Sequence, residues 1–387
     1  MTLLLDLSHT CHTAARTGIQ RVARSLRREL AGGALAVCFD PHEDAWRPLE
    51  PWETRNLDGA HPAGSRASRW PVSAQIRGRL RRGRRPGVLA PGAASGVVVP
   101  EVFSGDVQAA LGRLFEASAG PTVALFHDAL CLQIPEYSPA STRRRFPSYL
   151  SALLRFDGIA AVSQASRSAL LDYWAWLGAA HPPPVEAIPL GIDPPLGMRE
   201  THYTGPPVVL SVGSIEGRKN HLALLDACEA LWAEGARFEL RLIGMANRET
   251  GAAALRRISA LASSGRPLRY DGPADEKELE GAYAACSFTV YPSLAEGFGL
   301  PVAESLSRGR PCLCRFSGAL GEVASGGGCL DLGSGSAAEI KAALGGVLGA
   351  PYALARLGAS ARARHFRTWT QYAADLGSWM SGLRRRG

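Results

Sequence analysis

The stretch Glu296-Gly297-Phe298-Gly299-Leu300-Pro301-Val302-Ala303-Glu304-Ser305 decides how the rest of the chain is interpreted. An apolar run at 286–291 and the pair Pro292-Ser293 precede it. This order predicts a buried strand, a turn, a loop that carries glycines, and a helix whose first residue is Pro301.

The loop in this stretch has the chemistry of a ligand site. Gly297 and Gly299 let the backbone pass close to a ligand, and the helix start presents unpaired N–H groups that suit a phosphate. Glu296, before the loop, and Glu304, expected in the first helical turn, suit sugar hydroxyls, because carboxylates accept hydrogen bonds. A nucleotide sugar has both parts. A solvated acidic loop before a helix whose glutamate favours its N-terminus is the alternative.

A second stretch supports the ligand interpretation. The run 208–213 is typical of a buried strand, and an amphipathic helical pattern covers 222–231. Arg218 and Lys219 lie between them, where a strand hands over to a helix and α/β sheets bind ligands. Lysine is scarce, since only three of the 43 Lys and Arg residues are lysines. A pair of solvated surface cations is the alternative.

These motifs resemble glycosyltransferase family 4, whose members are retaining enzymes of GT-B architecture. The resemblance extends over nearly the whole chain, and it rests on these stretches: 296–304, 213–220, 17–22, 127–128, 162–166 and 188–193. It implies an α/β protein with two doubly wound Rossmann-like domains facing a central cleft. Residues 1–193 would bind the acceptor and 194–367 the donor, with a C-terminal helix at about 368–387 packing back on the first domain.

The resemblance also implies how the donor is held and activated. Arg218 and Lys219 would stabilise the charge that grows on the departing diphosphate, aided by the N–H groups of Phe298, Gly299 and Leu300. The donor phosphate itself would take the acceptor proton on the same face of the sugar, so that the anomeric configuration is retained.

The remaining roles implied by the resemblance concern the sugar and the ribose. His127 would hold a sugar hydroxyl near the reacting carbon, Glu296 the opposite edge of the hexose, and Glu304 the ribose. Additional donor contacts are expected from residues at strand ends and helix starts: Gly18, Ser163, Gly213, Met245 and Asp271. The family often has two adjacent glycines where this chain has Thr17-Gly18.

The sequence contains no Asp-x-Asp pattern, so we expect side chains and a helix end, instead of a metal, to neutralise the diphosphate, and we expect no cofactor. The eight cysteines lack zinc-like spacing. Cys312 and Cys314 alternate in a strand-like run, where we expect small core residues. These features predict a reduced, cytoplasmic protein.

Composition limits the other classes of function. The chain has 387 residues, 46% of them hydrophobic, and a net charge of +8, which favours anionic partners. No apolar run approaches the roughly 18 residues of a membrane span, and no cationic segment precedes Leu3-Leu4-Leu5, so we expect no signal peptide. A G-x-G-x-x-G after the first strand and a Walker A motif are both absent, which argues against a dinucleotide oxidoreductase.

Apolar runs alternate with helical patterns along most of the chain, as in a parallel α/β sheet. Strands are expected at 2–7, 35–39, 97–102, 123–126, 158–162, 185–188, 208–213, 238–243, 268–270, 288–291 and 311–315. We expect 40–96 to be mostly loop, and 191–207 to link the domains. The run 77–85 holds six arginines in nine residues, which indicates either a solvated segment or a contact with anionic lipid headgroups or a lipid diphosphate acceptor. Without interleaved aromatic residues it does not predict nucleic-acid binding.

The expected reaction is hexose transfer to an acceptor glycan or lipid-linked saccharide. The segments 127–137 and 214–221 resemble mannosyltransferases of bacterial surface polysaccharides, which makes GDP-mannose the first choice of donor. A UDP-hexose is the alternative donor, and a catalytically silent sugar-nucleotide-binding subunit is the alternative function.

Overall fold

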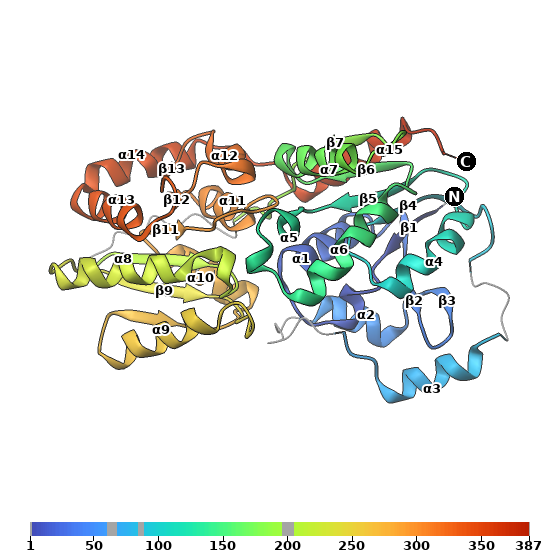
Figure 1. The fold of residues 1–387 in the computed structure, drawn as a ribbon, viewed down its shortest axis with the longest axis horizontal. Coiled ribbons are helices and arrows are strands. Elements are labelled where there is room, and N and C mark those ends of the chain that lie inside the picture. Colours follow the sequence, from blue (N-terminus) through green and yellow to red (C-terminus); the bar gives the residue numbers. More distant parts are fainter. Residues whose placement is uncertain (1, 60–67, 84–88, 196–204, 387) are drawn as a thin grey trace. The chain divides into compact units, whose positions relative to one another are not determined.

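The computed structural model describes residues 2–59, 68–83, 89–195 and 205–386. The chain divides into two compact units (Figure 1). Unit 1 comprises Met1–Ala129, Ser141–Leu190 and Trp369–Gly387, and unit 2 comprises Leu130–Ala140 and Gly191–Thr368. The assignment of the domains to acceptor and donor stays a prediction.

Unit 1 is built on a parallel sheet with one antiparallel edge strand. The strand order is β3-β2-β1-β4-β5-β6-β7, and only the β2–β3 pair is antiparallel among the described residues. The strands are β1 (Thr2–Asp6), β2 (Ala34–Asp40), β3 (Ala45–Pro48), β4 (Ala94–Val99), β5 (Thr122–Phe126), β6 (Gly158–Ala161) and β7 (Val185–Ala187). Most central positions are buried apolar residues, as expected where helices cover both faces of a parallel sheet.

Helices connect the strands of unit 1. They are α1 (Gly18–Glu29), α2 (Pro51–Asp58), α3 (Val72–Arg81), α4 (Gly105–Glu116), α6 (Ala140–Leu153), α7 (Gln164–Trp176) and α15 (Trp369–Ser381). The last of these returns from the far end of the chain and packs against α1. Gly158 permits this return, because a Cβ there would lie 2.8 Å from the Trp379 ring.

Unit 2 has a fully parallel sheet in the doubly wound order. Its strands run β10-β9-β8-β11-β12-β13, so the order reverses between β8 and β11. They are β8 (Val208–Val212), β9 (Glu239–Ile243), β10 (Leu268–Tyr270), β11 (Phe288–Tyr291), β12 (Cys312–Cys314) and β13 (Cys329–Asp331).

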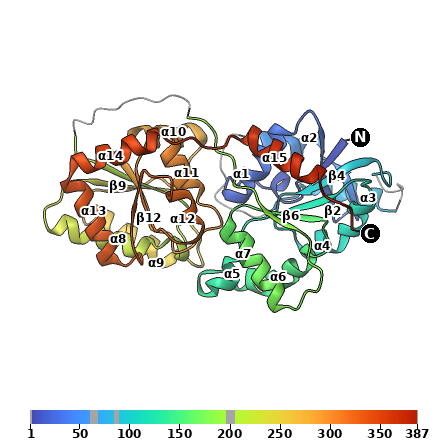
Figure 2. The ribbon, with the colours of Figure 1, turned by 90° about the horizontal axis from the view of Figure 1, so that it is seen from above.

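Helices cover both faces of this sheet (Figure 2). They are α8 (His221–Ala233), α9 (Ala252–Ser263), α10 (Glu276–Ala285), α11 (Leu300–Ser307), α12 (Gly318–Ala324), α13 (Ala337–Gly349) and α14 (Pro351–Arg362). The short helix α5 (Leu130–Gln133) is also assigned to unit 2. Apolar residues of α8, α9 and α13 share one core with the strands, while α10 packs on the opposite face through Ala282 and Tyr283. The strands that the sequence predicted are confirmed within a few residues, and the edge strands β3 and β13 were missed.

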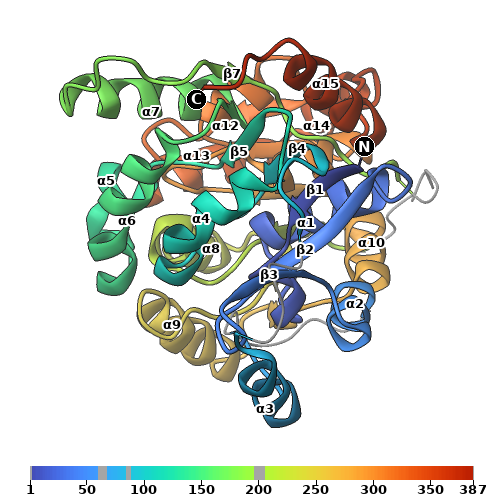
Figure 3. The ribbon, with the colours of Figure 1, turned by 90° about the vertical axis from the view of Figure 1, so that its right-hand side faces the viewer.

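The expectation of a loop over 40–96 is wrong for its described part. This region contains β3, α2 and α3, and α3 lies at the edge of unit 1 beyond β3 (Figure 3). A capping box at Glu50 and Glu53 starts α2. The arginine run 77–85 begins in α3 instead of in a loop, and Arg84 and Arg85 lie outside the described residues. The helices were missed because both are short and their apolar periodicity is weak.

Two further details concern the expectations for single elements. Helix α11 begins at Leu300, one residue earlier than expected, so that Glu304 lies in the second turn and not in the first. All eight cysteines are buried and free, with Cys312 and Cys314 in β12 as expected. Among the described helices, none combines the length and hydropathy needed to cross a bilayer.

Candidate functional site

The candidate site of unit 2 lies at the carboxyl ends of β8 and β11, where the strand order reverses. A parallel sheet leaves a crevice at such a point, because the connections from the two strands run to opposite faces. The segment after β8 forms a 3-10 turn at Gly217–Lys219, and the segment after β11 leads to α11. The residues that the sequence singled out in two distant stretches therefore meet here.

A backbone hydrogen bond holds the two segments together. The N–H of Leu294 donates to the carbonyl of Arg218 over 2.8 Å. Asn220 closes the 3-10 turn in the left-handed region at φ 58°, and its side-chain amide donates to the Gly335 carbonyl. The positions of Arg218 and Lys219 are thus fixed by the main chain.

Glu296 is the centre of the polar cluster. One carboxylate oxygen, Oε2, lies 2.8 Å from Arg218 Nη1, and the other, Oε1, lies 2.5 Å from Lys219 Nζ. Oε1 also accepts hydrogen bonds from the hydroxyls of Tyr291, at 2.9 Å, and Ser293, at 2.5 Å. The structure thus brings together three of the predicted site residues in one ion cluster.

Burial and charge set the ionisation of this cluster. Burial acts to raise the pKa of Glu296, but attraction by Arg218 and Lys219, together with hydrogen bonds from Lys219 and Ser293, outweighs it and lowers this pKa to about 2. Burial, reinforced by the neighbouring Arg218, lowers the pKa of Lys219, while Glu296 opposes that change. Burial also raises the pKa of the Tyr291 hydroxyl well above its ordinary value. Arg218 keeps 23% of its side chain exposed and is the cation that a ligand can reach.

The start of α11 completes one side of the site. Gly299 adopts φ +104°, and a Cβ at this position would lie 2.8 Å from Leu320 Cδ2, so that only glycine fits without strain. Phe298 is half-buried and Leu300 is buried. The carboxylate of Glu304 is buried as well, and it accepts a hydrogen bond from Tyr283 over 3.1 Å.

The ends of β8, β9 and β10 lie side by side next to this cluster. The N–H of Gly213 bonds to the Ile243 carbonyl, and the carbonyl of Met245 accepts from Ile215. Gly244 has no Cβ, which permits the close approach of the two strand ends. A Cβ there would lie 2.0 Å from the Gly213 carbonyl oxygen. Asp271, after β10, is paired with Arg241 at 2.6 Å and with Arg269.

Unit 1 holds the other predicted residues. His127 follows β5 and is buried. Its Nε2 lies 2.7 Å from the Pro100 carbonyl, and the tautomer with a proton on Nε2 donates this hydrogen bond. Burial lowers its pKa, which favours the neutral ring. Ser163 caps α7 through a hydrogen bond from the Ser166 N–H. Gly18 begins α1, and a Cβ there would meet nothing within 4 Å.

Sequence reasoning missed three contributors to the unit 2 cluster. Tyr291 and Ser293 bond to Glu296, and Glu216 lies 2.8 Å from Arg218 Nη2. Their closeness in sequence to Glu296 and Arg218 was the only available signal. Tyr137 also packs within unit 2 against the turn after β8, since a Cβ on Gly217 would lie 2.6 Å from its ring.

Comparison with protein families matches residues 206–348, most of unit 2, to the family described as glycosyl transferases group 1. Residues 206–348 are a glycosyl transferases group 1 domain. The cluster around Glu296 lies inside this glycosyltransferase domain.

Known relatives extend the likeness beyond the matched domain. The chain is 27% identical over 351 residues to the serotype-specific mannosyltransferase WbdA of Escherichia coli, which covers 83% of this chain. It is 30% identical over 216 residues to the O-antigen chain mannosyltransferase B of Escherichia coli, covering 53% of this chain and 56% of that protein. The chain spans 40% of the length of WbdA.

Solved structures show that the fold is GT-B. Sucrose-phosphate synthase from Thermosynechococcus elongatus superposes with a TM-score of 0.69 at 18% identity, over 98% of both chains. Anabaena Alr3699/HepE in complex with UDP-glucose superposes with a TM-score of 0.71 at 16% identity, over 99% of this chain and 100% of that one. The expected fold class is therefore confirmed, while the roles of the individual residues stay predictions.

The ion pairs of Glu296 predict a pH-dependent stability. Its pKa of about 2 lies below the ordinary value of 4.5, so the stabilisation is complete above pH 4.5 and is lost as the pH falls toward 2. Glu296→Gln should lower the free energy of unfolding at pH 7 by on the order of 3 kcal/mol. The deficit should shrink between pH 4.5 and pH 2, as measured by urea unfolding. Glu249→Gln, at an exposed glutamate, is the control, and a deficit that stays constant down to pH 3 would contradict the assignment.

Proposed function

We propose that the protein is a retaining hexosyltransferase that moves a sugar from a nucleotide diphosphate sugar to an acceptor glycan or lipid-linked saccharide in bacterial surface polysaccharide synthesis. GDP-mannose is the proposed donor. The observation that carries the proposal is the cluster of Arg218, Lys219 and Glu296 at the strand reversal of a glycosyl transferases group 1 domain.

The charges of this cluster suit a leaving diphosphate. Glu296 and Glu216 together neutralise Arg218 and Lys219 before a ligand arrives. A diphosphate would compete for these two cations, because it carries more charge than one carboxylate and Arg218 is partly exposed. The cations would then stabilise the charge that develops when the sugar bond breaks, with the N–H groups at the start of α11.

The same exchange gives Glu296 its role toward the sugar. Once Arg218 and Lys219 bind the diphosphate, the Glu296 carboxylate is able to accept hydrogen bonds from hexose hydroxyls. Glu304 would bind the ribose, with the ribose hydroxyls taking the place of the Tyr283 hydroxyl that it now accepts. His127 would contribute a hydrogen bond to the sugar from its own unit. We propose that this step uses neither a metal nor a cofactor at the diphosphate.

The donor is argued from relatives that act on mannose. Two Escherichia coli relatives are mannosyltransferases by name. A UDP-hexose is the alternative, and Anabaena HepE, a structure with UDP-glucose bound, shares the fold at 16% identity. Gly244, Met245 and Asp271, at the ends of β9 and β10, are the proposed border of the base. A catalytically silent nucleotide-sugar-binding subunit is the alternative function.

The two glutamates should respond differently to loss of charge. Glu296→Gln should leave affinity for the nucleotide diphosphate unchanged or raise it, since the cations lose a competitor, and should lower turnover by about 100-fold. Glu304→Gln should weaken nucleotide binding by about tenfold or more, because it removes a hydrogen bond to a charged group. Calorimetry measures the affinities, and release of label from GDP-mannose measures turnover.

Tyr283→Phe serves as the control for Glu304, because it removes one hydrogen bond to the carboxylate and keeps the carboxylate itself. Equal losses of nucleotide affinity in both glutamate variants would refute this division of roles. A wild-type protein that binds nucleotide sugars without any turnover would support the silent-subunit alternative.

The donor preference is testable by thermal stabilisation. A ligand that binds only the folded state raises its stability by mass action, by about 2.7 kcal/mol at 100 times its dissociation constant. GDP and GDP-mannose should therefore raise the melting temperature more than UDP and UDP-glucose at equal concentration. Stabilisation by UDP alone would reject the mannose donor and leave the glycosyltransferase assignment in place.

We also propose that α3 contacts an anionic membrane. Ala74 and Gly78 face the protein, and a Cβ on Gly78 would lie 2.7 Å from His42 Cβ. The opposite face exposes Val72, Ile76 and Leu80, with 70%, 50% and 58% of their surface in solvent. An apolar stripe on a cationic helix is typical of segments that lie in a membrane interface.

The arginines of α3 and its end fall into two groups, one paired within the protein and one exposed to solvent. Arg77 and Arg81 pair with Glu50 at 2.7 and 2.8 Å, so these two arginines of the run anchor the helix to α2. Arg79 and Arg82 are exposed beside the apolar stripe. Each cation near an anionic surface contributes about 1 kcal/mol, so these two residues suit lipid headgroups.

Vesicle binding should depend on both properties of α3. Ile76→Ser with Leu80→Ser should weaken sedimentation with anionic phosphatidylglycerol vesicles at all salt concentrations. Arg79→Gln with Arg82→Gln should weaken it mainly at low salt, where charges are less screened. Tyr352→Ser, at an exposed aromatic residue of α14, is the control. If the wild-type protein does not bind such vesicles, α3 does not contact an anionic membrane and the arginine run is a solvated segment.

A further inference from the structure

The amino-terminal unit contains a buried group of side chains that the transfer reaction does not use. Cys11 and His12 lie in the 3-10 turn that follows β1, Cys38 lies in β2, and Glu53 lies in α2. All four are buried, and one ligand atom of each lies within 4.8 Å of the others. We propose that Cys11, His12, Cys38 and Glu53 form a structural metal site that binds Zn²⁺.

Two of the distances within the group are those of a tetrahedral site. Cys11 Sγ lies 3.5 Å from His12 Nε2, and Cys38 Sγ lies 3.6 Å from Glu53 Oε1. With Zn–S near 2.3 Å and Zn–N or Zn–O near 2.0–2.1 Å, tetrahedral geometry requires sulfur to lie about 3.6 Å from nitrogen or oxygen. His12 Nε2 and Glu53 Oε1 are 2.8 Å apart, so this one edge would have to lengthen by about 0.5 Å.

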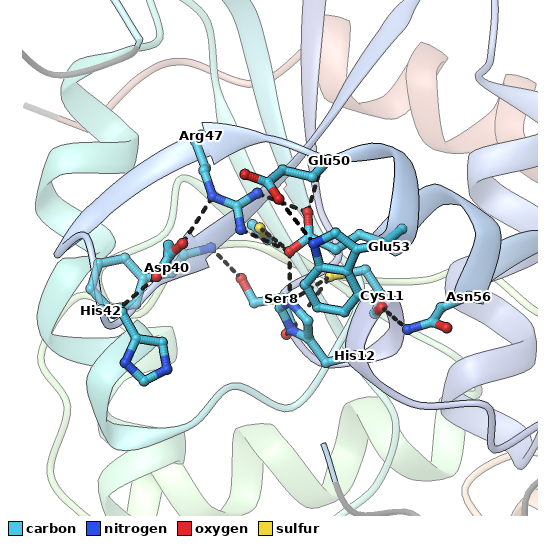
Figure 4. Close-up of polar contacts among 12 residues, drawn as sticks. Ser8, Cys11, His12, Asp40, His42, Arg47, Glu50, Glu53 and Asn56 are labelled. Atoms are coloured by element: carbon cyan, nitrogen blue, oxygen red, sulfur yellow. Dashed lines mark hydrogen bonds and ion pairs between the residues drawn. The ribbon is translucent and has the colours of Figure 1, made fainter. Parts of the chain in front are cut away.

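The orientation of His12 supports a cation between its ring and Glu53 (Figure 4). Nδ1 lies 2.7 Å from the Ser8 carbonyl, to which only an N–H is able to donate. In the neutral ring, Nε2 then presents a lone pair toward the Glu53 carboxylate. A proton shared with the carboxylate or a metal ion would satisfy this lone pair. Metal-binding histidines usually donate their other N–H to a carbonyl or carboxylate, as His12 does to Ser8.

The charges around the group suit a divalent ion. Arg47 binds Glu53 through Nη1 and Nη2 at 2.7 and 2.8 Å and binds Asp40 through Nε at 3.0 Å. Zn²⁺ would displace the two thiol protons, so two positive charges replace two protons and the net charge of the buried group is unchanged. Arg47 holds the carboxylate that faces the two sulfur atoms, and it acts as a positioning residue.

The donor set and its burial indicate the class of metal. Two thiolates, an imidazole and a carboxylate suit zinc better than magnesium or calcium, which prefer oxygen ligands. Four protein ligands leave no open position, which is typical of a structural site. Trp70 and Trp52 cover the imidazole with ring centroids 4.0 and 5.4 Å away. Both also line a cavity of about 500 Å³.

This proposal departs from the expectation of no metal in the chain. The sequence concealed the site because Cys11-His12, Cys38 and Glu53 come from three separate elements without the short paired spacing of zinc motifs. It is independent of the proposed transferase activity, since none of the four ligands belongs to the donor machinery.

Metal content and cobalt spectroscopy test the site. The full chain, purified without chelating resin, should contain about one zinc per molecule by plasma mass spectrometry. Replacement by Co²⁺ should give the thiolate-to-cobalt charge-transfer and intense ligand-field absorption of tetrahedral sulfur coordination. Cys38→Ser and Glu53→Gln should each lower zinc affinity by more than about tenfold, whereas Cys228→Ser, at a buried cysteine of α8, should keep it.

The wild-type measurements decide the matter even where a variant fails to fold. Zinc-free protein whose refolding with Co²⁺ gives no such absorption would overturn the proposal and leave a protonated hydrogen-bond network. A metal-free protein in which peptide mapping locates a disulfide between Cys11 and Cys38 would overturn it equally.

Discussion

The ion cluster around Glu296 is the interaction on which the candidate site depends. A buried ammonium without a partner is costly, because water no longer solvates it, and Lys219 is buried. Glu296 supplies the compensating charge and also holds Arg218, while Tyr291 and Ser293 bond to the same carboxylate. The loops after β8 and β11 must therefore keep their mutual register, which the bond from Leu294 to Arg218 reinforces. Two cations are thus held in place before any ligand binds.

The two units use buried charge for different ends. In unit 2 the cluster remains partly accessible through Arg218, so that its pairing is able to change when an anion arrives. In unit 1 the network of Arg47, Asp40 and Glu53 is almost fully enclosed, and it links β2, β3 and α2. An enclosed network holds three elements together, whereas an accessible one is suited to exchange partners with a substrate. The same residue types therefore suit a structural role in one unit and a binding role in the other.

The surface of unit 1 adds a third arrangement of charge. On α3, arginines one turn apart face inward to Glu50, and the two exposed arginines flank Ile76 and Leu80. This division follows from the helical period, because residues four apart share a face while residues two apart lie on nearly opposite faces. In an extended loop the same six arginines would all have been solvated, and no apolar stripe would exist.

The sequence by itself determined the fold class and three members of the ion cluster, Arg218, Lys219 and Glu296. Buried strands read as continuous apolar runs, and glycines with charged residues at strand ends stand out against them, so Arg218, Lys219, Glu296 and the loop before α11 were identifiable from local pattern. The tertiary structure decided which charges meet. It paired Glu296 with both cations and hydrogen-bonded Glu304 to Tyr283. It also paired Asp271 with two arginines. Cys11, His12, Cys38 and Glu53 come together from three elements. Most of these contacts join residues from different elements, and side-chain direction and burial, which local periodicity does not encode, fix each of them.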